Sequence, residues 1–216
     1  MKNTKKENGK ARVLNKTEFN RVVKYQSNTR HGLRNVLLLH LSFFIGLRSK
    51  EMSALTVGDL IDVNGDLKEE VTLKRHQTKR GKQRRFYLTN DKLKKVLVNY
   101  LTFRKEREGE LNLESPLITN QMSGKFSSAS LQQLFKKMYT SVGIDASSHS
   151  GRRSFCTNLS ECGVSSTNLQ TLMGHQSIST TALYINENPK ILGKITADYS
   201  LWGNWRIFSN VVFKKY

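Results

Sequence analysis

The chain has 216 residues and carries 36 lysines and arginines against 17 aspartates and glutamates, which gives a formal net charge of +19 at pH 7. This length suits one well-packed domain with short additional segments, and a hydrophobic content of 37% with only 2 prolines argues against a disordered or loop-rich secreted chain. The charge predicts a polyanionic partner, which leaves DNA, RNA and anionic membranes as candidates.

The ends and the most apolar stretch of the chain bear on its location. Residues 1–12 are polar and cationic without apolar periodicity, so we expect a flexible basic arm that is not followed by a signal-peptide core. The longest apolar stretch, 36–47, is interrupted by polar residues and is shorter than the roughly 20 residues of a membrane span. We therefore expect a cytoplasmic protein without a membrane partner.

Helical periodicity opens the folded part of the chain. Thr17 is a candidate N-cap for a helix that carries Phe19, and a longer apolar helix is predicted over 33–47, with Gly46 at its end. His40, on the apolar helix, is most simply a packed core residue.

The periodicity changes after residue 55. Apolar residues from Leu60 lead into an Asn64-Gly65 turn, and short apolar runs follow around Val71 and Phe86, which predicts a small antiparallel sheet. Its second hairpin has Gly81 at the turn and is rich in basic residues, which we expect to contact DNA. These residues are Lys74, Arg75, Lys79, Arg80, Lys82, Arg84 and Arg85.

The rest of the chain returns to helical periodicity. The predicted helices cover 90 or 91–108, 127–141, 150–162, 167–173 and 180–185. The result is a mainly α fold with a small antiparallel β-sheet (α+β), with one domain over 13–189. The tail, 190–216, is apolar and contains Trp202 and Trp205, so it must pack on the chain's own core or on a neighbouring protomer.

Short polar motifs carry the candidate chemistry. In 46–52 (GLRSKEM), Arg48 precedes Glu51 by three residues, which by itself indicates only a helical ion pair. In 149–152 (HSGR), a histidine and an arginine share one helix face. In 172–184 (LMGHQSISTTALY), a glycine ends a helix before a histidine, and a tyrosine follows nine residues later; a capping histidine and a buried tyrosine would also explain that pattern.

Taken together, the order of these motifs resembles the tyrosine recombinase (phage integrase) family over 14–184. The resemblance implies the catalytic-domain fold of that family and site-specific DNA cleavage and rejoining through a 3′-phosphotyrosyl bond, without a cofactor. The implied catalytic residues are Arg48, Lys79, His149, Arg152, His175 and the nucleophile Tyr184. No metal is implied, and the chain lacks a carboxylate cluster spaced for Mg²⁺ and a Cys or His pairing around Cys156 and Cys162 spaced for zinc.

Each implied role has a physical reason. A phenol is a poor nucleophile while protonated, so Tyr184 needs cationic neighbours and a proton acceptor, for which His149 is the candidate. Guanidinium groups bind two non-bridging phosphate oxygens at once, which suits the two arginines. Lys79, with Lys82 in reserve, would protonate the leaving 5′ oxygen, and His175 would donate a hydrogen bond to the phosphate.

The chain also departs from the family pattern. Gly151 stands where many members have leucine, so we expect looser packing at the start of that helix. The catalytic region begins about a dozen residues in, without the separate N-terminal helical domain of most members, as in the short invertases of fimbrial switches. The implied partners are double-stranded DNA with specific recombination sites and a homotetramer on paired sites at the nucleoid, and accessory DNA-bending proteins remain open.

Three other functions compete with recombination. A DNA-binding regulator with the same fold would lack activity, although all six catalytic positions are filled here. An enzyme similar to type IB topoisomerases would relax supercoils without exchanging strands between sites. A basic RNA-binding module would explain the charge but not the order of the motifs.

Overall fold

The computed structural model describes residues 11–62, 64–78, 81 and 83–184. Most of the predicted basic arm and all of the tail at 190–216 lie outside these residues, as do Lys79, Arg80 and Lys82. The predicted α+β class is confirmed, because the described chain is mostly helical and has one small antiparallel sheet. No described helix is both long and apolar enough to cross a membrane.

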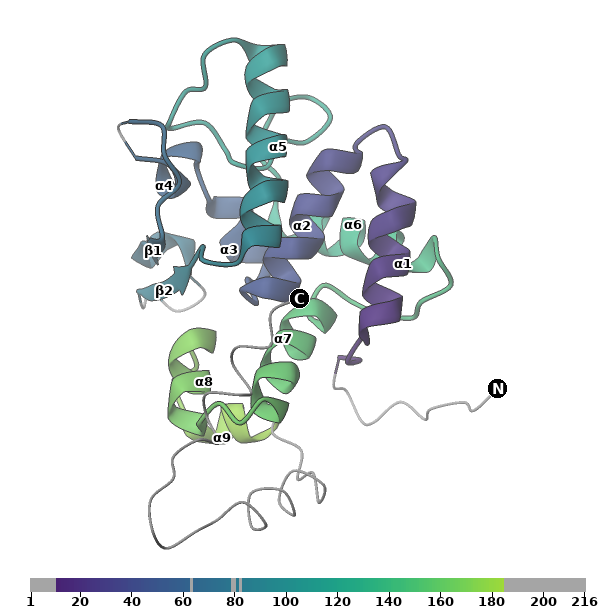
Figure 1. The fold of residues 1–216 in the computed structure, drawn as a ribbon, viewed down its shortest axis with the longest axis vertical. Coiled ribbons are helices and arrows are strands. Elements are labelled where there is room, and N and C mark those ends of the chain that lie inside the picture. Colours follow the sequence, from purple (N-terminus) through teal and green to yellow (C-terminus); the bar gives the residue numbers. More distant parts are fainter. Residues whose placement is uncertain (1–10, 63, 79–80, 82, 185–216) are drawn as a thin grey trace, which may run out of the picture.

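The elements form a helical body with a smaller helical group below it (Figure 1). In the body, α2 (Gly32–Phe44) packs against α1 (Lys16–Ser27) and α5 (Asp91–Glu108), while α6 (Ser128–Thr140) packs against the short α3 (Ser49–Ala54). The lower group consists of α7 (Ser150–Glu161), α8 (Ser166–Met173) and α9 (Ile178–Ala182). The large core lies in the body, and a small apolar cluster around Cys156, Leu169 and Met173 lies in the lower group.

Helix α1 begins earlier than predicted from the sequence. Asn15, not Thr17, is its N-cap, because the Asn15 side chain accepts from the backbone N–H of Glu18 while the Glu18 carboxylate accepts from the N–H of Asn15. This reciprocal pair is a capping box, which satisfies two amide donors that would otherwise lack partners. Helix α2 ends two residues before Gly46, whose φ of +61° turns the chain towards α3.

The sheet is smaller than predicted. It consists of β1 (Glu70–Leu73) and β2 (Arg84–Tyr87), which pair antiparallel with Val71 opposite Phe86. The predicted hairpin around Asn64-Gly65 is reduced to a single bridge between Ile61 and Leu67. Leu60, predicted to lead into the sheet, lies instead in a short helix, α4 (Val57–Leu60). Thr56 and Asp59 form a capping box there, which favours the start of a helix over a strand.

Helix α7 approaches α2 closely at Gly151. A Cβ atom at Gly151 would lie 2.4 Å from Oγ of Ser42 and 2.9 Å from a ring carbon of Phe43. The expectation of looser packing at this position is therefore wrong. Glycine lets the two helix backbones approach each other, which brings the first turn of α7, and with it Arg152, to the end of α2.

The histidine on the apolar helix, His40, is a packed core residue as predicted. His40 is buried, and its Nδ1 lies 2.8 Å from the carbonyl oxygen of Val36. Cys156 is buried and Cys162 is exposed, both as free thiols.

Candidate active site

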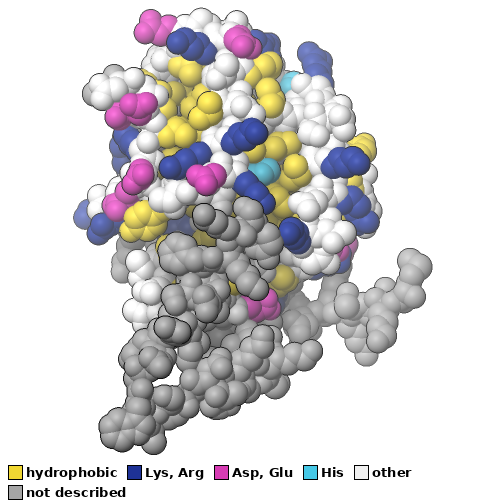
Figure 2. All heavy atoms as spheres, viewed as in Figure 1, with side chains coloured by type: hydrophobic (Ala, Val, Ile, Leu, Met, Phe, Trp, Pro, Cys, Tyr) yellow, Lys and Arg dark blue, Asp and Glu magenta, His cyan; other side chains and the backbone are white. Residues whose placement is uncertain are grey.

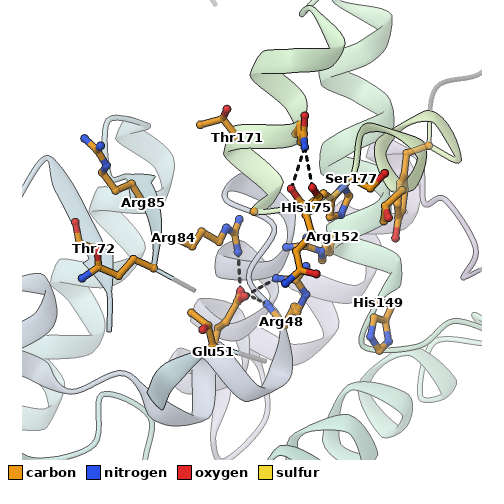
Figure 3. A pocket seen from close by; sticks show the side chains of 17 residues that line it. Arg48, Glu51, Thr72, Arg84, Arg85, His149, Arg152, Thr171, His175 and Ser177 are labelled. Carbon is orange, nitrogen blue, oxygen red and sulfur yellow. Dashed lines mark hydrogen bonds and ion pairs between the residues drawn. The ribbon is translucent and has the colours of Figure 1, made fainter. Parts of the chain in front are cut away.

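A pocket of about 940 Å³ opens where α3, the β-hairpin and the lower helical group meet (Figure 3). Its lining contains five of the six predicted catalytic residues. These are Arg48, His149, Arg152, His175 and Tyr184. The sixth, Lys79, lies outside the described residues. Segments far apart in the sequence therefore bring their motif residues to one cavity.

Arg48 is held at the start of α3. Its backbone N–H donates to Oε2 of Glu51 at 2.8 Å, and its Nη1 donates to Oε1 of the same carboxylate at 2.6 Å. The helical ion pair predicted from the GLRSKEM segment is thus confirmed. The Arg48 side chain keeps 24% of its surface exposed, so the guanidinium is fixed by Glu51 while it still reaches the pocket.

Arg152 connects the end of α2 to the end of α8. It is buried, and its two terminal nitrogens donate to the carbonyl oxygens of Gly46 and Met173, both at 2.5 Å. Burial and the nearby charges of Arg84 and Arg48 lower its pKa well below the ordinary value. The charged form is therefore held at an energetic cost, which an anion in the pocket would reduce.

Arg84 does not occupy the place that the sequence analysis gave it. It was expected among the DNA-contacting cations, but it is only 4% exposed and its Nη1 pairs with Oε2 of Glu51 at 2.6 Å. The reason is strand alternation: Arg84 and Phe86 face inward from β2, while Arg85 and Tyr87 face outward. That alternation was the sequence signal that could have identified it.

Glu51 is the carboxylate that Arg48 and Arg84 share. It is fully buried and accepts from both Arg48 and Arg84, as the dashed lines in Figure 3 mark. Burial raises its pKa, but Arg84, Arg48 and then Arg152 outweigh burial, so the net pKa is lowered and Glu51 stays ionised. The GLRSKEM segment predicts only its ion pair with Arg48, because Arg84 lies 33 residues away in the sequence.

His175 follows directly after Gly174, which ends α8 with a φ of +58°. Its Nδ1 lies 2.9 Å from Oγ1 of Thr181, and its ring stacks on Tyr184 with centroids 5.4 Å apart. Burial and then Arg152 and Arg48 lower the His175 pKa to about 4. The imidazole is therefore neutral near pH 7 and can offer one N–H donor to the pocket.

Tyr184 is attached to the lower helical group. Its backbone N–H donates to the carbonyl oxygen of Thr181 at 2.9 Å, and its own carbonyl oxygen accepts from Oγ1 of Thr157 on α7 at 3.4 Å. His149, the N-cap of α7, is exposed and also lines the pocket, with Nδ1 3.4 Å from Oγ of Ser148. The pocket therefore contains both the predicted nucleophile and the predicted proton acceptor.

The charges that line the pocket are unbalanced. Of its described lining residues, four are arginines and one, Glu51, is a carboxylate. On the described part of the face shown in Figure 2, by comparison, lysine and arginine side chains are scattered and do not gather at one place. Within the described ranges, no group of three or more His, Cys, Asp or Glu residues could hold a metal ion. The arrangement suits a phosphate group bound by guanidiniums.

The remaining described cations of the hairpin are exposed. The side chains of Lys74 and Arg85 are 61% and 65% exposed, and Arg75 is exposed as well. Lys74 lies 3.6 Å from Asp59, and Arg85 lies 3.3 Å from Glu70. Such weak surface pairs leave these cations able to contact a polyanion.

The pocket, the fold and the motifs together define a tyrosine recombinase catalytic domain, and residues 12–190 match the model of the phage integrase family. The chain belongs to this family. It is 30% identical over 192 residues to the tyrosine recombinase XerA of Pyrococcus horikoshii, covering 89% of this chain and 62% of that protein. It is 28% identical over 175 residues to the tyrosine recombinase XerD of Oceanobacillus iheyensis, covering 80% of this chain and 56% of that protein.

Solved structures share the fold. A crystal structure of XerA recombinase aligns with a TM-score of 0.68 at 18% identity, covering 91% of this chain and 66% of that chain. The XerH site-specific recombinase in a pre-cleavage complex with its difH substrate aligns with a TM-score of 0.63 at 22% identity, covering 85% of this chain and 53% of that chain. The chain thus spans between about half and two thirds of the length of these relatives.

Proposed function

We propose that this chain is a site-specific DNA recombinase that cuts and rejoins DNA strands through a 3′-phosphotyrosyl bond to Tyr184. The observation that carries the proposal is the pocket itself, where four arginines and one carboxylate surround a space that Tyr184 and His175 also line. A phosphodiester would reduce the excess positive charge and lie beside a nucleophilic hydroxyl. Membership of the phage integrase family supports the same reaction class.

The proposed cleavage step is an in-line displacement at the scissile phosphorus. The phenolic oxygen of Tyr184 forms the new bond to phosphorus, and its proton passes to His149. The bond to the 5′ oxygen breaks, and Lys79, or Lys82 in its absence, protonates that oxygen. Arg48 and Arg152 bind the non-bridging oxygens while negative charge increases on them.

Rejoining reverses these steps. The phosphotyrosyl bond conserves the energy of the broken phosphodiester, so the 5′ hydroxyl of another strand restores the DNA without a cofactor. His175 donates a hydrogen bond to the phosphate and, being neutral, does not compete as a proton donor for the leaving group. Its hydrogen-bonding neighbour Thr181 and the stacked Tyr184 ring hold the imidazole in place.

The proposed partners follow from this chemistry. The substrate is double-stranded DNA with specific sites, and exchange between two sites requires four protomers, with the tail at 190–216 as the segment proposed to connect them. The proposed outcome is inversion, integration or excision of a DNA element, and accessory DNA-bending proteins would assist it. Because the proposed substrate is DNA, we propose a cytoplasmic protein at the nucleoid.

A trapping experiment tests the proposal. Wild-type protein and Tyr184→Phe are incubated with nicked duplexes that carry candidate recombination sites, and adducts that resist SDS are measured. We expect an adduct with the wild type alone. An equal adduct with both proteins would transfer the nucleophile to another residue, and specific binding without any adduct would favour a silent DNA-binding regulator. Relaxation of plasmids that lack paired sites would favour a topoisomerase-like activity.

A further inference from the structure

The guanidinium of Arg84 is fully engaged inside the protein. Its Nη1 donates to Glu51 at 2.6 Å and to the carbonyl oxygen of Gly46 at 3.4 Å. Its Nη2 donates to the carbonyl oxygens of Ile45 at 2.8 Å and Leu172 at 2.7 Å, and its Nε donates to Leu172 at 3.0 Å. These contacts use all five N–H donors of an arginine, so none remains for a DNA phosphate.

The acceptors of Arg84 belong to the segments that carry the catalytic groups. Glu51 also binds the backbone and the guanidinium of Arg48. The carbonyl oxygens of Ile45 and Gly46, directly after α2, both accept from Arg84. The carbonyl oxygen of Gly46 also accepts from Arg152. The shared acceptors place Arg84 next to both phosphate-binding arginines (Figure 3).

Arg84 also contacts the segment that carries His175. A Cβ atom at Gly174 would lie only 2.8 Å from Cδ of Arg84, so the aliphatic stem of Arg84 packs against the residue that precedes His175. Leu172, which accepts two hydrogen bonds from Arg84, lies three residues before His175. Since Gly174 adopts a positive φ, this close approach requires glycine at that position.

Charge compensation explains why an arginine is used here. Glu51 is buried among three guanidiniums, those of Arg84, Arg48 and Arg152, which stabilise its ionised form. One carboxylate roughly cancels the charge of one buried arginine. Arg84 contributes positive charge that keeps Glu51 ionised, and it has no N–H donor left for the substrate. Arg48 and Arg152 are therefore the arginines left to bind the phosphate.

On this basis we propose that Arg84 is a positioning residue for DNA cleavage, which fixes Arg48, Arg152 and His175 at once by joining β2 to Glu51, to the end of α2 and to the end of α8. The inference rests on the proposed recombinase activity. It assigns a role in the reaction to a basic hairpin residue that its sequence context marks as a DNA contact. Arg85, its exposed neighbour on the same strand, remains in the DNA-contacting group.

The test separates the cleavage rate from DNA affinity. Arg84→Lys and Arg84→Met are compared with wild type on a nicked duplex, with the rate of the covalent step measured in a single turnover at saturating protein and the dissociation constant measured separately. Lysine keeps the charge next to Glu51, but its single ammonium cannot bind Glu51, Ile45 and Leu172 together. We expect the cleavage rate to fall about 100-fold in Arg84→Lys and further in Arg84→Met, with affinity within about threefold of wild type.

Arg104→Met is the matched control. Arg104 is as buried as Arg84 and binds Glu108 and two backbone carbonyls, but it lies outside the pocket lining. The Arg104→Met variant should be less stable than wild type, but below its unfolding temperature it should keep the wild-type cleavage rate. This control separates a loss of stability from a loss of positioning. If Arg84→Met does not fold, Arg84→Lys decides.

Two results would overturn the inference. One is a wild-type cleavage rate in Arg84→Lys, and the other is a loss of affinity as large as the loss of rate, which would make Arg84 a direct DNA contact. Failure of the proposed function would look different, because the wild-type protein itself would then form no adduct with Tyr184.

Discussion

Two buried arginines, Arg104 on α5 and Arg152 on α7, show how differently one residue type is used in this molecule. Arg104 donates to the Glu108 carboxylate and to the carbonyl oxygens of Pro116 and Leu117. Arg152 donates to two backbone carbonyls, and burial together with the arginines around it lowers its pKa. The first arrangement is balanced in charge, whereas the second is left with positive charge for a ligand. Burial of a cation alone therefore does not identify a binding site. An excess of positive charge around the buried cation does.

The largest expected effect tests this difference directly. Arg152→Lys removes the planar fork that binds two phosphate oxygens, so the single-turnover cleavage rate should fall by about 10²–10³-fold. Arg104→Lys should keep a cleavage rate near that of wild type and lower the free energy of unfolding by about 1–3 kcal/mol, because buried acceptors lose partners. A fast Arg152→Lys enzyme would show that the phosphate is bound elsewhere.

The next effect concerns the helix contact that places Arg152. Gly151→Ala puts a methyl group against Ser42 on α2, and the resulting overpacking should cost about 1–3 kcal/mol of unfolding free energy in a denaturant titration. Ser42→Ala should recover part of that loss in the double variant, since Oγ of Ser42 is the nearest atom and has no hydrogen-bond partner among the described residues. Additive effects of the two substitutions would contradict the close contact.

Local signals made much of the fold predictable. Helix α5 has Asn90 as its N-cap and Gly109 at its end, and α6 has Ser127 as its N-cap, so both were predicted within a residue or two. The start of α1 was missed because two cap candidates lie close together, and the capping box with Glu18 selects Asn15.

Most of the site was predictable from motif order, but the contacts that hold it were not. The Arg48–Glu51 pair is local in sequence, whereas Arg84 reaches Glu51 across 33 residues and Leu172 across 88 residues. The basic composition of the hairpin also obscured the alternation that turns Arg84 inward. Gly151 was misjudged because the residue that it meets, Ser42, lies on another helix.

A smaller effect follows from the low pKa of His175, which burial and the neighbouring arginines produce. Its folded-state pKa of about 4 lies below the ordinary value of 6.5, so the unfolded chain binds the proton first as pH falls. The stability contributed by the neutral imidazole is present above pH 6.5 and is lost as pH falls towards 4. Allowing for solvent screening, about 1–2 kcal/mol should be lost between pH 7.5 and 5.

His175→Asn is the comparison for that measurement. The variant cannot titrate, so its free energy of unfolding should fall less over the same interval of pH in the absence of DNA. Equal losses in both proteins would assign the acid sensitivity to other groups and would contradict the inference that burial and the neighbouring arginines keep His175 neutral.

The smallest expected effect compares Arg85, an exposed arginine of the hairpin, with Lys136, an exposed lysine of α6. Arg85 is exposed at the pocket lining, and its pair with Glu70 is long, so it should neutralise about one DNA phosphate. Arg85→Ala should therefore reduce the slope of log affinity against log salt by about 1, with a modest loss of affinity at low salt. Lys136 on α6 is also exposed, but it pairs with Asp145 at 2.5 Å outside the pocket, so Lys136→Ala should keep the wild-type slope. If both substitutions changed the slope equally, DNA would be attracted by the net charge of the whole chain rather than by the hairpin. Arg85 would then not act as a specific DNA contact, in contrast to the role proposed for its buried neighbour Arg84.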